Sequence, residues 1–290
     1  MSGIVGSRLN IRGSGIVGGI GTDGQVLTSS GAGQEMVFED AGGGAVTAIN
    51  NATANELVTI GATTTELDAE SGLTYTDGAL VLGGTTPTLT IGDAGAEDTK
   101  IIFDGNAQDY YIGLSDGSDA LKIGLGSTLG TTMSVNLDAA GIMTRPLHPA
   151  FATRNSAVMY VDVGGNQTIQ FDTEIFDVNA DFNTGTYTFT APVTGKYLLA
   201  SRIDMINPQD ASNSAQQHLL YFTTSNRTYE IHHSGYPTDT RRHSESASVV
   251  ADMDANDTAY MRIYMRNGTA SVTSLEAGDF TRSTFSGFLI

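Results

Sequence analysis

The groups that could perform chemistry in this 290-residue chain are carboxylates, serines and five histidines, because the chain contains no cysteine. A thiol nucleophile and a disulfide are therefore both excluded. We expect none of the serines to act as an activated nucleophile in a strained elbow turn. Carboxylates are numerous, but no pair stands out as the acid and base of a glycosidase. The sequence predicts no catalytic residue, and we expect a protein that is not an enzyme.

Two short motifs resemble cofactor or metal loops. Residues 13–18 (GSGIVG) satisfy the dinucleotide pattern, but glycines continue through 18–21, so the helix that the mechanism requires does not begin there. Residues 252–256 open like a calcium loop, yet the sixth place is Asp257 instead of glycine and the twelfth is Ile263 instead of glutamate. We expect no nucleotide at the first motif and an acidic turn between two strands at the second.

The histidines are the remaining candidates for a metal site. His232 and His233 are adjacent, so on a strand they point to opposite faces and cannot bind one ion from the same side. His218 and His243 could approach each other only through the fold. One histidine per chain could also meet at the axis of a trimer. Surface or interface histidines are the preferred interpretation, and we expect no metal and no cofactor.

One stretch, TYEIHHSGYPTDTRRHSES at 228–246, has the composition of an exposed binding surface. Tyrosine and arginine are favoured in such surfaces because they combine a large contact area with directed hydrogen-bond donors, and paired arginines can bind carboxylates or phosphates. The predicted receptor-binding residues are Tyr236, Arg241, Arg242 and His233. The alternatives are a long solvated loop, or a contact between subunits in which arginine pairs with a neighbour's aspartate.

The composition limits the possible partners. The net charge of −18 disfavours binding to a phosphate backbone, so we expect no nucleic-acid partner. No run of about 18 apolar residues suggests a membrane span. The start, MSGIVGSRLN, lacks the charged and apolar sections of a signal peptide. We expect a chain that is not inserted into a membrane and does not leave a cell by the general secretory route.

Residues 1–44 are rich in glycine and show little periodic hydrophobicity, so this segment cannot bury enough apolar surface to fold alone. We expect it to become ordered by binding another protein. The predicted anchoring residues are Ile4, Val5, Arg8, Ile11 and Arg12. The alternative is a disordered leader.

Residues 45–148 contain short apolar runs such as GALVLGG and TKIIFDG, which indicate short strands separated by turns. These strands are too short for a single chain to enclose a core. Three chains wound together could close such strands around a shared interior, which predicts an intertwined trimeric β shaft. A monomeric sandwich is the alternative.

Residues 149–290 have longer strands and more aromatic residues. The stretch TAYMRIYMR alternates strictly and places Met261, Ile263 and Met265 on one face of a strand. Many strands and almost no helical periodicity predict an antiparallel sandwich. The predicted fold class for the whole chain is therefore all-β.

The stretch 171–197 carries large aromatics at definite intervals, ending in GKY: Phe171, Asp177, Phe182, Phe189 and Gly195–Tyr197. This spacing resembles the signature of the globular head of the first complement component's subunit q, a trimeric jelly roll related to tumour necrosis factor. The end of the chain, FSGFLI, resembles that family's closing strand. The resemblance implies that the aromatics fill the core, that Asp177 holds a turn, and that Gly195 lets the chain turn into a central strand.

The sequence departs from that signature at Leu199 and Ser201, where the family pattern has aromatics. No Gly-X-Y repeat precedes the head, so collagen stalks and complement ligands are not implied. The resemblance covers roughly residues 149–290.

The first half resembles structural fibre proteins of marine tailed phages, in MSGIVGSRLNIRGSGIV, in GTDGQVLTSSGAGQEMVFED and in GNAQDYYIGLSDGSDALKIGLGS. This implies a homotrimeric fibre or spike of the virion, a particle found outside the cell. Its N-terminus would bind another virion protein, and its head would attach to a host-surface glycan or protein. The alternatives are a capsid head fibre or decoration protein, a fibre-borne glycan depolymerase, or a secreted bacterial adhesion protein.

Overall fold

In a computed structural model of the chain, the regular secondary structure is almost entirely β, which confirms the predicted class. The one helical element among the described residues is a 3-10 turn, η1 (Asp116–Ser118). Internal contacts divide the chain into two units, Met1–Ile91 and Gly92–Ile290. The structure describes residues 22–29, 36–40, 48–51, 53–61, 66–206, 217–234, 242–266, 273–277 and 282–290.

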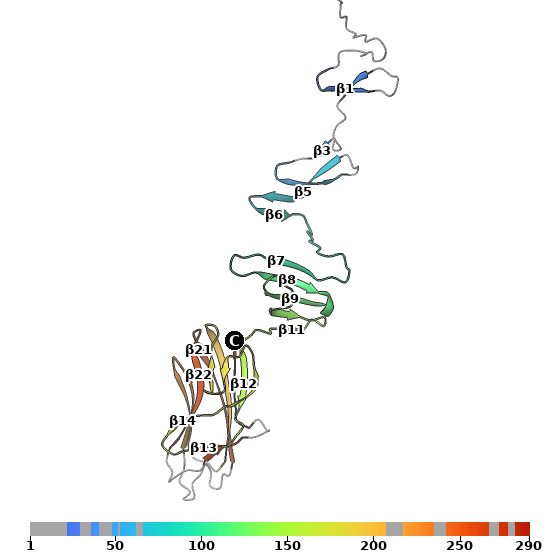
Figure 1. Ribbon diagram of the computed structural model, residues 1–290. Helices are drawn as coiled ribbons and strands as arrows, with labels where there is room; N and C mark the ends of the chain where they lie inside the picture. Colours follow the sequence, from blue (N-terminus) through green and yellow to red (C-terminus); the bar gives the residue numbers. More distant parts are fainter. Residues whose placement is uncertain are drawn as a thin grey trace, which may run out of the picture. The chain divides into compact units, whose positions relative to one another are not determined.

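The first unit contains two small sheets (Figure 1). One is the antiparallel pair of β1 (Gln25–Ser29) and β2 (Met36–Asp40). In the other, β5 (Glu66–Thr76) pairs with β3 (Ala48–Asn50), β4 (Glu56–Ile60) and β6 (Ala79–Leu82). None of the described side chains of this unit is buried. As expected from the sequence, these strands do not enclose a core within one chain.

The second unit begins with a five-stranded antiparallel meander, in which each strand pairs with the next (Figure 1). Its strands are β7 (Thr99–Phe103), β8 (Tyr110–Ser115), β9 (Ala120–Leu125), β10 (Met133–Leu137) and β11 (Met143–Thr144). On one face Tyr111 is fully buried and lies opposite Gly124, where an added Cβ would come within 2.4 Å of the tyrosine Oη. Only a glycine leaves room for the ring there.

The opposite face of the meander is apolar and exposed, because side chains alternate along each strand and the register aligns them in rows. Ile101 lies beside Ile112, and Ile112 beside Ile123. The exposed fractions of seven of its side chains run from 36 % at Ile123 to 55 % at Phe103, whereas Leu125, Val135 and Leu137 are half-buried. We call this surface the apolar meander face: Ile101, Phe103, Tyr110, Ile112, Leu114, Leu121, Ile123, Leu125, Val135 and Leu137.

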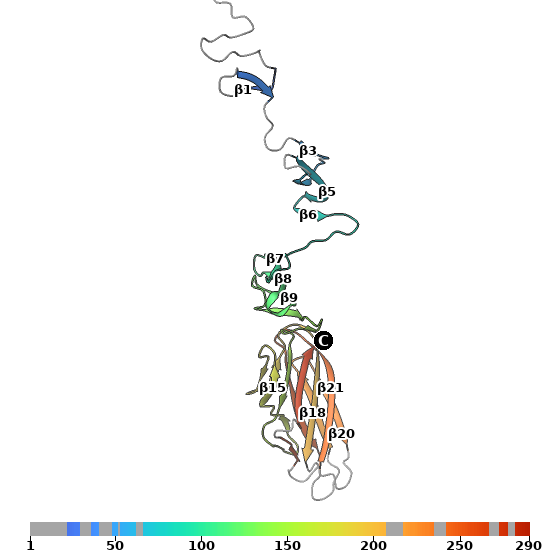
Figure 2. The same cartoon turned by 90° about the vertical axis from the view of Figure 1, so that its right-hand side faces the viewer.

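Residues from 150 onward form a sandwich of two antiparallel sheets (Figures 1 and 2). The first sheet consists of β13 (Met159–Val161), β23 (Thr273–Leu275), β18 (Gly195–Ile206), β24 (Thr284–Leu289), β12 (Ala150–Arg154) and β15 (Thr173–Asp177), with β21 (Arg242–Met253) also on β18. The second consists of β16 (Phe182–Asn183), β17 (Thr188–Thr190), β22 (Thr258–Arg266), β19 (Gln217–Thr224) and β20 (Thr228–Ser234), with β14 (Asn166–Thr168) on β22. This is the predicted antiparallel jelly-roll head.

The core between the two sheets is aromatic. The ring of Phe151 stacks on Phe189 with centroids 4.6 Å apart and on Phe182 at 5.1 Å, and it meets Phe285 edge-on at 5.0 Å. On β22, every second side chain is buried, as the strict alternation of its sequence predicted. The aromatics of the 171–197 signature therefore fill the core, which confirms that prediction.

The turns within the signature also follow the prediction. The Asp177 carboxylate accepts hydrogen bonds from the backbone N–H groups of Asp181 (3.1 Å) and Phe182 (2.9 Å). Gly195 is the first residue of β18, a central strand of its sheet, and its backbone is not in the left-handed region. An added Cβ at this position would lie 2.5 Å from Leu289 Cδ1, so this leucine would have to move.

The two positions that depart from the family signature are also accommodated in the first sheet. Leu199 is fully buried, and the hydroxyl of Ser201 donates a hydrogen bond to the Thr284 carbonyl at 3.0 Å. Neither position leaves a polar group unpaired in the core.

Phe189→Ala should reduce the free energy of unfolding by about 3–5 kcal/mol, because the ring is 1 % exposed and its removal leaves a cavity between the sheets. Phe189→Leu, which keeps more of the volume, should cost clearly less. Urea denaturation of the full-length variants measures both. An alanine variant that unfolds with the parent chain would contradict the placement of this ring in the core.

Asp181 should make stability depend on pH. Burial, with the nearby Asp177 charge, raises the pKa of its carboxyl to about 6, and the Oδ2 atom is buried without a described hydrogen-bond partner. The unfolded value is about 3.9, so the folded state retains the proton and loses stability as pH rises from about 4 to about 6.

Asp181→Asn should therefore stabilise the protein relative to the parent at pH 7 and much less at pH 4, as thermal unfolding at both values would show. The matched control is Asp172. Burial opposes ionisation of this carboxyl, but hydrogen bonds from Ser156 and Thr173 lower its pKa. Asp172→Asn should then be more destabilising at pH 7 than at low pH. The same pH trend in both variants would contradict the assignment.

Candidate functional site

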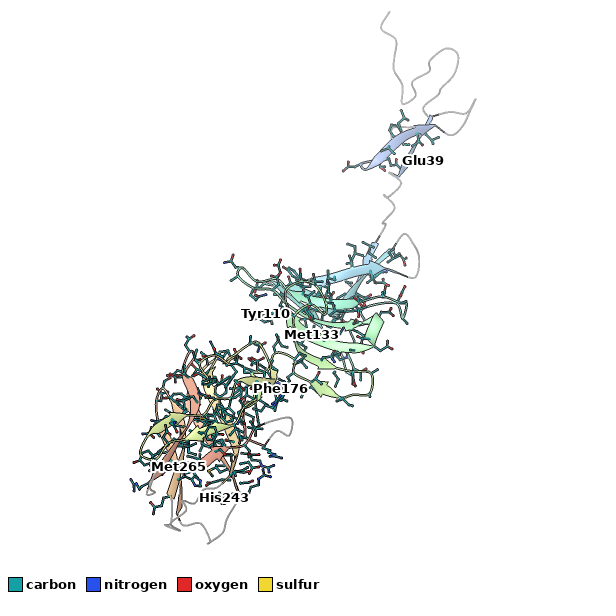
Figure 3. All side chains as sticks on the ribbon, turned by 60° about the horizontal axis from the view of Figure 1, so that its bottom comes forward. Glu39, Tyr110, Met133, Phe176, His243 and Met265 are labelled. Carbon is teal, nitrogen blue, oxygen red and sulfur yellow. The ribbon has the colours of Figure 1, made fainter. Side chains whose placement is uncertain are left out.

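One end of the jelly roll gathers ionisable side chains from both sheets. Met205, at the end of β18, pairs with His243, and His218, near the start of β19, pairs with Met265. Figure 3 shows His243 and Met265 at the same end of this domain. We call this the polar end, and its ionisable residues are Asp204, His218, Arg242, His243, Glu245, Glu276 and Arg282.

Part of the polar end is an ion-pair network centred on Arg242. Its Nη2 donates to Glu276 Oε2 at 3.0 Å, and its Nε lies 3.7 Å from Asp204 Oδ1. Arg282 also donates to Glu276, and the Ser244 hydroxyl donates to Asp204 at 3.1 Å. The side chain of Asp204 is only 4 % exposed, so these donors compensate for the loss of water around a nearly buried carboxylate.

The other part is a cluster of two imidazoles and a carboxylate. His218 is fully buried, and its Nε2 is hydrogen-bonded to Glu245 Oε2. The ring of His243 lies edge-on to that of His218, with centroids 5.7 Å apart. His218 is therefore part of the sandwich interior, which differs from the preferred expectation of surface or interface histidines. The fold brings together the two histidines that the sequence alone could not pair.

The sequence contains a signal for part of this cluster. His243 and Glu245 are two residues apart on β21, so both side chains point to the same side of the strand. Both residues fall in the stretch predicted to be an exposed binding surface, so their H-x-E spacing becomes informative only once the structure shows a strand there. Nothing in the sequence pairs them with His218 on another sheet.

Of the predicted receptor-binding residues, only Arg242 has a described side chain, and it belongs to the intrachain network. His233 lies on β20, opposite His218 in the ladder. Tyr236 and Arg241 lie outside the described residues, as do the predicted anchoring residues Ile4, Val5, Arg8, Ile11 and Arg12. Receptor binding and anchoring by these residues stay predictions.

Two motifs can be placed in the fold. Asp252 and Met253 end β21, and residues 254–257 form the predicted turn to β22, in which the Asp254 N–H donates to Asp257 Oδ2 at 2.8 Å. Residues 113–117 read G-L-S-D-G, the nucleophile-elbow pattern, contrary to the expectation that no serine suits that role. In the structure, Ser115 has extended backbone angles and is followed by the three-residue turn η1, whereas a nucleophile elbow leads into a helix.

The outer face of the first sheet is shallow and carries small side chains over its central strands, including Ala200, Ser246, Ser248 and Ser286. Beside them lies a row of apolar side chains that follows the register from β21 across to β12. Val250 is 53 % exposed and Phe288 is 45 % exposed. We call this surface the head face: Val250, Leu198, Phe288, Ala150, Ser248, Ala200, Ser286, Ala152 and Phe176.

The two-sheet order and the aromatic core can now be compared with known proteins. Residues 150–290 match the C1q domain family. This half of the chain has the C1q/TNF jelly-roll fold. Domains of this type are trimeric ligand-binding modules and are generally not enzymes. A comparison with curated proteins finds no match to the chain.

Solved structures similar to this chain include three with the same type of domain. The globular domain of zebrafish complement 1qA protein is 20 % identical, with a TM-score of 0.36, over 49 % of this chain and 97 % of that one. Eiger TNF from S. frugiperda is 16 % identical, with a TM-score of 0.38, over 50 % of this chain and 94 % of that one. Murine APRIL is 11 % identical, with a TM-score of 0.37, over 49 % of this chain and 99 % of that one.

Arg242→Ala should reduce the free energy of unfolding by about 1–2 kcal/mol, because Asp204 and Glu276 lose a charged donor in a poorly hydrated position. The matched control is Lys196→Ala, which removes an exposed ion pair with Asp252 (3.4 Å) and should cost less than about 1 kcal/mol. Urea denaturation compares the two. Equal effects would show that the Arg242 network is no more important to stability than a surface ion pair.

Proposed function

We propose that this chain is the subunit of a homotrimeric fibre or spike on a phage particle. Its N-terminal segment, residues 1–44, binds another virion protein, and residues 45–148 form a shaft. The C1q/TNF-like head, residues 149–290, attaches the particle to a glycan or protein on the host surface. Attachment of this kind requires binding without any chemical step.

The apolar meander face carries this proposal. Soluble proteins rarely expose contiguous apolar surface on this scale unless another molecule covers it. Rows of isoleucine, leucine, phenylalanine and tyrosine cross four strands of one sheet, and the chain has no second layer over them among its described residues. We assign this face to contact with two further copies of the same chain, which closes three sheets around a common apolar interior.

The head face supports the same assembly independently. Small side chains at Ala200, Ser248 and Ser286 allow another chain to approach the sheet closely, and the exposed Val250 and Phe288 supply apolar contact beside them. C1q/TNF-like domains are trimeric, so a self-contact on this sheet agrees with the type of domain.

Trimerisation also gives the proposed mechanism of attachment. Three heads on one fibre, and several fibres on one particle, raise weak individual contacts to useful avidity. The resemblance of residues 1–144 to fibre proteins of marine tailed phages supports the location on a virion. No helix among the described residues is long and apolar enough to cross a membrane.

Purified full-length chain should inhibit adsorption of the parent phage to its host. Ile112→Asp introduces a charge into the apolar meander face and should weaken the trimer, so that it dissociates at concentrations at which the parent chain remains trimeric. The concentration of chain that inhibits adsorption by half should therefore rise about 100-fold or more, because avidity is lost. The matched control is Lys122→Asp, which places the same carboxylate on the opposite face of the sheet and should inhibit like the parent chain.

Two results would contradict the proposal in different ways. If Ile112→Asp remained trimeric and inhibited fully, the apolar meander face would not be the subunit contact. The attachment function would be wrong if the purified parent chain did not inhibit adsorption and an antibody specific for the chain did not label intact particles. On labelled particles, electron microscopy would distinguish a tail fibre from a capsid fibre.

A further inference from the structure

At the polar end, three side chains of the kind that bind transition metals converge from the two sheets of the sandwich. The ligand atoms of His218, His243 and Glu245 all lie within 4.8 Å of one another. We propose that these three residues form a binding site for one zinc-like divalent cation in each chain. The site joins the two layers of the jelly roll and is separate from attachment to a host.

The backbone positions all three ligands on regular strands. His243 and Glu245 alternate on β21 in the first sheet, so they point to the same side, toward the interior. His218 lies on β19 in the second sheet. The register fixes both strands, with His243 opposite Met205 and His218 opposite Met265. Ligands on paired strands are placed more rigidly than ligands on loops, which favours a defined site.

The donor set selects the class of cation. Two imidazole nitrogens and one carboxylate oxygen suit zinc, which is bound at about 2.0–2.2 Å by such ligands in tetrahedral geometry. Calcium and magnesium prefer an all-oxygen shell and are not expected here. Tetrahedral bonds of that length place ligand atoms about 3.3–3.6 Å apart, so small side-chain rotations from the observed cluster are sufficient. Three protein ligands leave the fourth position for water.

The alternative is that the cluster serves only as a buried hydrogen-bonded pair. The contact between His218 and Glu245 accounts for two of the three groups. The ring of His243 also lies against that of His218, from a different sheet, so all three ligand atoms face one another. Coordination would use all three groups and would replace the direct His218–Glu245 hydrogen bond by bonds to one ion. In a chain without cysteine, it also provides a cross-link between the sheets that no disulfide can supply.

The test uses full-length chain freed of metal with a chelator and titrated with zinc, and separately with cobalt. We expect one ion per chain, the intense visible absorption of tetrahedral cobalt, and a melting temperature that rises with zinc because the ion binds only the folded state. His243→Ala and Glu245→Gln each remove a half-buried ligand and should weaken zinc binding at least about 10-fold. Fully buried His218 is left unchanged because its replacement risks unfolding.

The matched control is His148→Gln, which removes a histidine of the same domain that lies outside the cluster and contacts the Leu289 carbonyl at 2.6 Å. It should bind zinc like the parent chain. The proposal is overturned if the parent chain binds no zinc. It is also overturned if both cluster variants bind as tightly as the parent, or if one ion binds per three chains, which would indicate a site shared on a trimer axis.

Discussion

Burial of apolar side chains is the interaction on which the rest of this structure depends, and one chain achieves it only in its second half. The described hydrophobic core consists of residues between Phe151 and Phe285, with the Phe151, Phe182, Phe189 and Phe285 rings at its centre. Before residue 149, Tyr111 and Ala120 are the only described apolar side chains that are buried. The C1q/TNF-like domain is therefore complete within one chain, whereas the sheets before it present apolar faces that require a partner.

The same contrast separates the two kinds of site. The apolar meander face and the head face are surfaces on which strand alternation exposes apolar side chains that no other described residue covers, which suits self-association. The polar end is the opposite case. There the interior of the sandwich ends in the imidazoles of His218 and His243 and the carboxylate of Glu245, whereas Asp204 and Arg242 lie on the other face of the first sheet. The side chains of Asp204 and His218 are almost fully removed from water. Buried charges of this kind are stable only when they are paired or bound to an ion.

Local patterns in the sequence predicted local features. The alternation of TAYMRIYMR gave the buried face of β22, and the signature spacing placed the Phe182 and Phe189 rings in the core and Asp177 at a turn. Contacts between distant residues were beyond such reasoning. Arg242 pairs with Asp204 and Glu276, and His218 meets His243 and Glu245, because the jelly-roll topology brings β18, β19, β21 and the segment after β23 to one end.

The measurement that tests the account most directly is the native mass of the full-length chain by light scattering. One chain has a mass of 30.3 kDa. If the apolar meander face and the head face are covered by two further copies, the particle in solution should have three times that mass, about 91 kDa. This mass should be found at all chain concentrations well above the dissociation constant of the trimer. A stable monomer of 30.3 kDa would contradict the account, because its exposed apolar faces would then be compatible with a soluble single chain.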